Sequence, residues 1–333
     1  MSAARLSGRL ARIREVRKRE ADARETDIIA ARKREAEILT ESGGAMSVCV
    51  RPAGESAAVT SRSVPGWSET APLLFEREAR VAVAGYRDGM SVHIPLLFPG
   101  ERETLESNGR LDVSSLAFFD LETTGLSRGA GTVAFMAGIA RFDEPGMLNI
   151  HQLLISDFPG EGAFLERLSA LLGDNPVLVS FNGKCFDSQV LLNRFLMNGI
   201  RPPFLAPGIV HLDLLFPSRR LWKNEMGSCR LSAIEEEILG IKRVDDLPGS
   251  EAPDAWFSFL RAGELDRLIA VGDHNRDDCF ALARLLFALD DAIDAGTGRA
   301  ALIRALDLRR QGRHEDASRL LSALAEAGDP TAC

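Results

Sequence analysis

The first residues that could do chemistry are two carboxylates, Asp120 and Glu122, in the stretch LAFFDLETTGL (116–126). They come directly after an apolar run and are one residue apart. Side chains alternate along a β-strand, so residues i and i+2 project from the same face. Two like charges at the end of a buried strand repel each other and lose hydration. A divalent metal with oxygen ligands would offset both costs; the alternative is one strand-capping carboxylate beside one solvated carboxylate.

A second polar group ends the stretch VLVSFNGKCFD (177–187). Its apolar strand stops at Asn182, and Asp187 lies in the first turn of the helix that follows. A carboxylate there commonly serves only to stabilise the helix dipole. Asn182 and Lys184 flank Asp187 and are candidates for a phosphate contact. Asp213, after the next apolar run, is expected to tether its own strand or loop.

A third group lies in DHNRDDCF (273–280), inside a long helical pattern. His274 and Asp278 are four residues apart and therefore share one helix face. Asp277 lies about 100° around the helix and is the weaker candidate. A surface pair is the alternative interpretation of His274 and Asp278.

The elements that must position these groups follow from periodicity and turn signals. Three apolar strands with short turns predict an antiparallel meander, and two further strands alternate with helices. The resulting order, β-β-β-α-β-α-β, is typical of a mixed α/β fold. The expected elements are strands over 116–122, 132–142, 148–156, 177–181 and 209–215, and helices over 162–172, 186–198, 231–239, 255–261 and 264–294.

The segments outside this core differ in composition. Residues 1–40 hold 11 Lys/Arg against 7 Asp/Glu and are expected to form a charged helix. Such a basic helix contacts nucleic acid, or it is solvated or binds a partner. Residues 41–76 are rich in Ser, Gly, Ala and Pro and are expected to be a linker. Residues 77–113 contain two short β-like runs, within 77–98, that predict a β-hairpin leading into the core.

Composition limits the class of protein. The chain has 333 residues, of which 45% are hydrophobic and 26% charged, as in ordinary soluble globular proteins. Its five cysteines form no CxxC pair, which suits a reducing compartment. We find no apolar run of roughly 18 residues, as a membrane span requires. We therefore expect a cytoplasmic protein with no membrane partner. The net charge of −8 argues against a generic nucleic-acid coat.

Taken together, the three polar groups resemble a known family. A strand-end Asp-x-Glu, a helix-start Asp and a helical His-x-x-x-Asp come in the order used by DEDD-type exonucleases, which have a ribonuclease H-like fold. The stretches between them are similar to the YprB-type ribonuclease H-like family over about residues 78–290. They are GTVAF (131–135), HLDL (211–214), RRLW (219–222), SCRLS (228–232), Glu235, LG (239–240) and DLPG (246–249).

This resemblance implies a ribonuclease H-like mixed sheet flanked by helices over residues 114–294. It also implies a metal-dependent nuclease, most simply a 3′→5′ exonuclease with a two-metal mechanism. The four carboxylates that match the metal ligands are Asp120, Glu122, Asp187 and Asp278. Hard oxygen ligands favour two Mg²⁺ or Mn²⁺ ions over zinc. The expected partner is nucleic acid, DNA or RNA, bound at a single-stranded 3′ end.

The sequence departs from the family at the general base. His274 stands four residues before Asp278, which is the position of the Tyr in the tyrosine subtype, whereas the histidine subtype spaces its His five residues ahead. His274 is therefore either the general base or a hydrogen-bonding partner of a ligand. Thr123 and Thr124 either contact the terminal sugar of the substrate or form the turn.

Two rival functions remain open. The fold is either a non-catalytic module that binds nucleic acid or protein, or a structure-specific endonuclease with the same metals. Residues 295–333 are expected to form a helical hairpin that resembles one tetratricopeptide unit. A single unit cannot form a solenoid, so it packs on the body or offers a docking face to a protein partner.

Overall fold

The computed structural model describes residues 63–89, 94–107, 111–125, 131–173, 177–202, 209–244, 246–296 and 298–326. These residues all fall within one compact unit. The expected basic helix over residues 1–40 and most of the expected linker lie outside the described residues.

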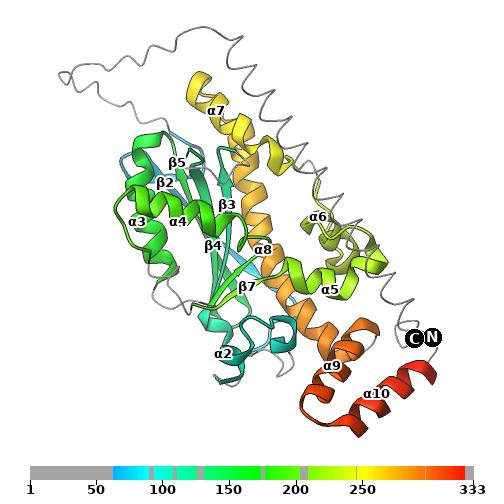
Figure 1. The fold of residues 1–333 in the computed structure, drawn as a ribbon. Coiled ribbons are helices and arrows are strands. Elements are labelled where there is room, and N and C mark those ends of the chain that lie inside the picture. The colour runs from blue at the N-terminus through cyan, green and yellow to red at the C-terminus, as the bar shows by residue number, and fades with distance from the viewer. Residues whose placement is uncertain are drawn as a thin grey trace, which may run out of the picture. The chain divides into compact units, whose positions relative to one another are not determined.

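Seven strands of the described chain form one mixed sheet in the order β1-β2-β5-β4-β3-β6-β7 (Figure 1). The predicted order β-β-β-α-β-α-β is confirmed from β3 to β7. The strands are β1 (Ser68–Ala71), β2 (Leu74–Ala82), β3 (Leu116–Thr123), β4 (Ala134–Glu144), β5 (Met147–Ile155), β6 (Val177–Ser180) and β7 (His211–Asp213).

The central strand β3 separates two kinds of pairing. It pairs antiparallel with β4, which in turn pairs antiparallel with β5, so the predicted meander is confirmed. On its other side β3 pairs parallel with β6, and β6 pairs parallel with β7. A strand with neighbours on both sides and helices on both faces must be apolar along most of its length, as the run LAFF is.

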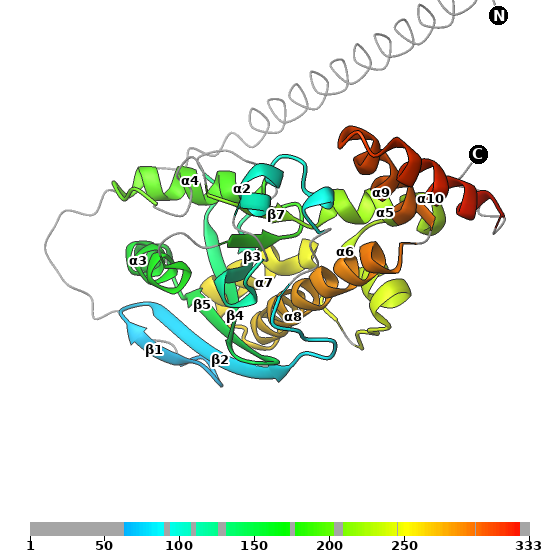
Figure 2. The same cartoon turned by 90° about the horizontal axis from the view of Figure 1, so that it is seen from below.

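Helices cover both faces of the sheet (Figure 2). The long helix α8 packs on β3, β4 and β5, while α3 packs on β2, β4 and β5 from the other face. The helices are α2 (Arg102–Ser107), α3 (Glu161–Leu172), α4 (Asp187–Met197), α5 (Leu215–Met226), α6 (Leu231–Ile234), α7 (Ala252–Ala262), α8 (Asp266–Ala295), α9 (Gly298–Arg310) and α10 (His314–Glu326).

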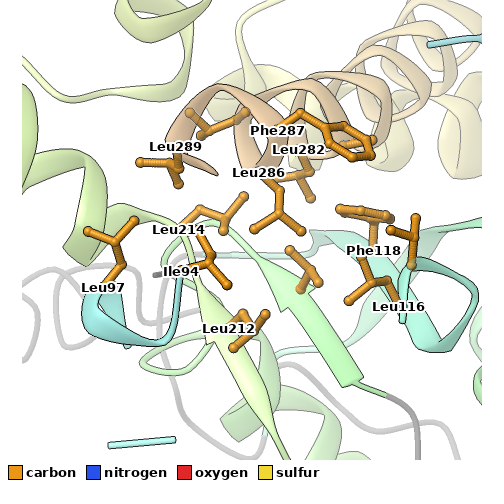
Figure 3. Close-up of a cluster of buried hydrophobic side chains, with 14 of the residues drawn as sticks. Ile94, Leu97, Leu116, Phe118, Leu212, Leu214, Leu282, Leu286, Phe287 and Leu289 are labelled. Carbon is orange, nitrogen blue, oxygen red and sulfur yellow. The ribbon is translucent and has the colours of Figure 1, made fainter. Parts of the chain in front are cut away.

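Alternation along β3 divides the core into two clusters. Leu116 and Phe118 pack against residues of α8 such as Leu282 and Leu286 (Figure 3). The odd-numbered residues of β3 face the second cluster, where Phe119 packs with apolar side chains of α3. The even-numbered residues of β3 therefore point toward α8, and this parity also applies to Asp120 and Glu122.

The predicted hairpin within residues 77–98 is wrong. β2 pairs with β1 on one side and with β5 on the other. Ile94–Leu97 forms a buried 3₁₀ helix instead of a strand. β1 lies inside the expected linker, where Ser68–Ala71 gave little apolar signal because these residues are mostly exposed at the edge of the sheet. Tertiary pairing with β5, distant in sequence, overrides the local turn signal at 86–89.

The C-terminal helices have the predicted positions. α9 and α10 pack on each other and are joined at residues 311–313. The expected helix over 231–239 is formed by α6 followed by a π-helical turn, Glu235–Leu239, and Gly240 ends it with a positive φ of 66°. In the described residues, we find no helix with the length and apolarity of a membrane span.

Candidate metal centre

Asp120 and Glu122 project from β3 toward α8, as the strand's parity requires. Glu122 is buried at 7% exposure, and Asp120 is half-buried. The register between β3 and β4 shifts after Glu122, so regular alternation ends immediately beyond the two carboxylates. The strand therefore delivers both side chains to one place at its carboxyl end.

Asp187 is the first residue of α4, and a tethered turn positions it. Asn182 opens this turn in the left-handed region, with φ of 65°. The buried Asp213 carboxylate accepts hydrogen bonds from the backbone N–H groups of Asn182 at 2.8 Å, Lys184 at 3.2 Å and Leu215 at 3.1 Å. The predicted tethering role of Asp213 is confirmed, and the turn places Asp187 beside the end of β3.

Asp278 and His274 share one face of α8, as their spacing predicts. Nε2 of His274 lies 3.7 Å from Oδ2 of Asp278. Asp277 points elsewhere, because its carboxylate is 45% exposed and pairs with Arg276 at 2.8 Å. The helix thus presents Asp278, and not its neighbour, to β3.

The carboxylates are close enough to perturb one another. Burial raises the pKa of Asp120 well above its ordinary value, and the charges of Asp278, Glu122 and Asp187 raise it further. Burial raises the pKa of Glu122 in the same way, with Asp278 and Asp187 as the next causes. Burial and the charge of Asp213 raise the pKa of Asp187 to about 7. The structure brings the four predicted carboxylates into one cluster, in which Glu122 and Asp187 are buried and Asp120 and Asp278 are half-buried.

This cluster fits a divalent cation by its chemistry. Carboxylates that raise each other's pKa repel one another, and a cation bound between them would offset this repulsion. A donor set made only of carboxylates suits Mg²⁺ or Mn²⁺ better than zinc. In the described part of the chain, however, no three His, Cys, Asp or Glu side chains are grouped closely enough to hold one ion. The cluster supplies the donors without a formed cage.

The side chain of one arginine, Arg243, already contacts the cluster. Nη2 of Arg243 donates hydrogen bonds to Oδ1 of Asp278 and, at 2.6 Å, to Oε1 of Glu235. Its Nη1 lies 3.0 Å from Nδ1 of His274. Arg243 is not among the residues that the sequence predicts, because the segment after Gly240 carries no periodicity and a contact between residues 35 apart leaves no local pattern.

His274 has a second neighbour that the sequence did not reveal. Oδ1 of Asp246 lies 2.8 Å from Nδ1 of His274. One ring nitrogen cannot donate to Asp246 and accept from Arg243 in the same tautomer. When Nδ1 carries the proton it donates to Asp246, and Nε2 then faces Asp278 as an acceptor.

Comparison with known proteins identifies the family of this chain. A model of the RNase H superfamily matches residues 117–289. The chain belongs to the RNase H superfamily. It is 38% identical over 194 residues to the uncharacterized protein YprB of Bacillus subtilis (strain 168), a match that covers 58% of this chain and 46% of YprB. It is 23% identical over 185 residues to DNA polymerase 1 of Sulfurisphaera ohwakuensis, covering 51% and 20% of the two chains. The match therefore spans less than half the length of either relative.

Solved structures also resemble the RNase H-like domain. The family B DNA polymerase of Pyrobaculum calidifontis has a TM-score of 0.40 and 15% identity, covering 54% of this chain and 25% of that one. Exonuclease I of E. coli, in complex with a dT13 oligonucleotide, has a TM-score of 0.33 and 18% identity, covering 47% and 42%.

The remaining predicted residues of the RNase H-like domain make contacts within a turn or an ion pair. The Thr123 hydroxyl donates to the carbonyl of Gly125 at 2.9 Å, and Oγ1 of Thr124 accepts from the backbone N–H of Val133 at 3.0 Å. Both threonines therefore form the turn, which is one of their two predicted roles. Nζ of Lys184 lies 2.5 Å from Oε1 of Glu101.

Proposed function

We propose that the RNase H-like domain is a metal-dependent nuclease that hydrolyses nucleic-acid phosphodiester bonds, with 3′→5′ exonuclease activity as its most specific form. The observation that carries the proposal is the cluster of four buried or half-buried carboxylates from β3, α4 and α8. Such a cluster is costly to fold unless cations neutralise it. Membership of the RNase H superfamily supports the same activity.

The residues that would hold two Mg²⁺ or Mn²⁺ ions are Asp120, Glu122, Asp187 and Asp278. When bound, such ions supply charge stabilisation and lower the pKa of a coordinated water. His274 lies beside Asp278 and is proposed to take part in proton transfer or to orient a ligand, with Asp246 fixing its ring.

The substrate side of the site rests on four further residues. Asn182 is exposed in the turn that precedes Asp187, and its side chain is proposed to contact a phosphate of a single-stranded 3′ end. Lys184 is proposed to contact the same phosphate once its ion pair with Glu101 is broken. Thr123 and Thr124 would meet the terminal sugar through groups not used in the turn. DNA and RNA are both substrates to test.

The test is degradation of a 5′-labelled single strand with Mg²⁺ or Mn²⁺. Asp120→Ala should abolish degradation, because it removes a carboxylate of the cluster. Asp277→Ala is the matched control: it removes a carboxylate from the same helix, but from an exposed position. Equal degradation by wild type and Asp120→Ala would overturn the proposal. A circular substrate separates the endonuclease alternative, because an exonuclease leaves it intact.

A second candidate is a non-catalytic module that binds nucleic acid or protein. The contact between Arg243 and Asp278 favours it, because the guanidinium already neutralises part of the cluster. Calorimetric titration with Mn²⁺ discriminates, since a module without a metal centre takes up no ion at millimolar concentration.

The flanking parts of the chain carry lesser proposals. The pair α9 and α10 is proposed to act as one tetratricopeptide-like hairpin that docks a protein partner. Cytoplasmic location is proposed because the three cysteines in the described residues, Cys185, Cys229 and Cys279, are all free thiols.

A further inference from the structure

A row of four residues crosses the sheet and ends at a proposed metal ligand. Arg77 of β2 pairs with Gln152 of β5, and Gln152 pairs with Gly138 of β4. Gly138 in turn pairs with Asp120 of β3. Cross-strand partners lie on the same face of a sheet, so this row lies beneath α8.

Asn275 of α8 fills the gap that Gly138 leaves in the row. A Cβ at position 138 would lie 2.5 Å from Oδ1 of Asn275 and 2.6 Å from Sγ of Cys279. Only a glycine therefore permits the helix to approach this closely. The Asn275 side chain is completely buried, with its amide between Gln152 and Asp120.

The hydrogen bonds along this row have one direction. Nε and Nη2 of Arg77 donate to Oε1 of Gln152 at 2.9 and 2.8 Å. Arginine has donors only, so it fixes which end of the Gln152 amide faces it. Nε2 of Gln152 must then donate, and it does so to the carbonyl of Gly272 at 2.7 Å and to Oδ1 of Asn275 at 2.9 Å.

The last hydrogen bond of the row joins Asn275 to the Asp120 carboxylate. Because Oδ1 of Asn275 is an acceptor toward Gln152, its Nδ2 faces Asp120 as a donor. Nδ2 lies 2.9 Å from Oδ2 of Asp120 and 3.2 Å from the carbonyl oxygen of the same residue. One carboxylate oxygen of Asp120 is thereby held in place, and the other is left to the cluster.

We propose that Arg77, Gln152 and Asn275 form a polar relay that positions the Asp120 carboxylate for metal binding. Asn275 is the positioning residue in contact with the proposed ligand, and Arg77 sets the direction of the relay from three strands away. The inference rests on the proposed function. Outer partners of this kind commonly change metal affinity by about 10- to 100-fold when mutated.

Gln152→Glu is the most informative variant. The carboxylate keeps the size of the side chain and its contact with Arg77, but it has no donor for Asn275. Asn275 must then turn its Nδ2 toward residue 152 and its Oδ1 toward Asp120. We expect the Kd for Mn²⁺, measured by calorimetry, to rise by about 10-fold or more. Asn224→Asp, on the exposed face of α5, adds the same charge as a control and should leave the Kd unchanged.

Asn275→Leu is the second variant, in case Gln152→Glu does not fold. Leucine has the branched shape and the number of side-chain heavy atoms of asparagine, but it removes both the donor to Asp120 and the acceptor for Gln152. It should raise the Kd for Mn²⁺ to a similar extent, with folding checked by thermal unfolding. An unchanged Kd in a folded Asn275→Leu protein would overturn the relay, because a residue that merely fills the core does not affect the metal.

A signal that needs no metal separates the relay from the proposed function. In the wild-type protein the two side-chain amide protons of Asn275 should exchange slowly with solvent and give one sharp pair of NMR signals. Gln152→Glu should shift these signals, since the bonding partners of Nδ2 change. Unchanged signals contradict the relay. Failure of the wild-type protein to bind Mn²⁺ contradicts the nuclease, while the amide signal still decides the relay.

Discussion

Arg243 donates a hydrogen bond to Asp278, so the carboxylate that α8 contributes to the candidate metal centre already has a cationic partner. The same nitrogen of Arg243 donates to Glu235, which is 2% exposed. One guanidinium therefore joins the segment after Gly240 to the cluster. Four measurements test what this and the neighbouring contacts contribute.

Arg243→Gln should destabilise the protein. It leaves Glu235 buried without its charged partner, and breaking one side of such a pair costs about 3–5 kcal/mol. Urea unfolding measures this loss. Arg267→Gln is the control, because its partner Glu251 is exposed and the pair contributes at most about 1 kcal/mol. Equal losses in the two variants would contradict the structural role of Arg243.

Gly138→Ala should also destabilise the protein, by about 1–3 kcal/mol, because the new methyl group collides with Asn275 and Cys279. Gly162→Ala is matched to it, since this glycine lies in α3 with open space around it. Alanine there should stabilise by about 0.5–1 kcal/mol through helix propensity. Thermal unfolding of both variants should therefore shift in opposite directions, and a shift of the same sign would argue against close packing of α8.

The metal-free protein should lose stability as the pH rises. The pKa of Asp187 is raised from 3.8 to about 7 in the folded state, so the unfolded chain releases its proton first. Stability is then greatest below about pH 4 as far as this group is concerned, and it falls until about pH 7. Asp187→Asn should weaken this dependence and stabilise the metal-free protein at pH 7.5. Urea unfolding at pH 5 and 7.5 measures the free energy of unfolding at each pH. An equal change in this free energy between the two pH values for wild type and variant would contradict the raised pKa.

Divalent ions should stabilise the folded protein. An ion that binds only the native state adds about 2.7 kcal/mol at 100 times its Kd. A thermal-shift titration with Mn²⁺ should show a rise in Tm that Asp120→Ala abolishes and Asp277→Ala retains. A rise of the same size in all three proteins would indicate non-specific binding outside the cluster.

The sequence was sufficient to predict the core of this fold, because short stretches of it carry the necessary patterns. LAFFDLETTG contains a complete strand, its end and two carboxylates within a few residues, so alternation alone places Asp120 and Glu122 together. Asp187 and the pair His274 and Asp278 lie at recognisable helix positions. Their meeting at one site followed from a family resemblance, because no local pattern encodes contacts across the sheet.

The features that were missed depend on tertiary contacts. Arg243 reaches Asp278 from an irregular segment, and Asn275 looks like an ordinary polar residue of a charged helix until its burial is known. β1 has mostly exposed residues, and β2 pairs with a strand more than sixty residues away, so the turn signal at residues 86–89 does not mark a hairpin.

The long-range pairing of β2 with β5 also sets the limits of the smallest unit that can fold. The family match begins at residue 117, yet a chain truncated there would lose β1, β2 and the arginine that directs the relay. It would expose the backbone of β5 along nine residues as an open edge, which favours aggregation. An autonomous fragment of this protein must therefore start before Ser68, well ahead of residue 117, where the family match begins.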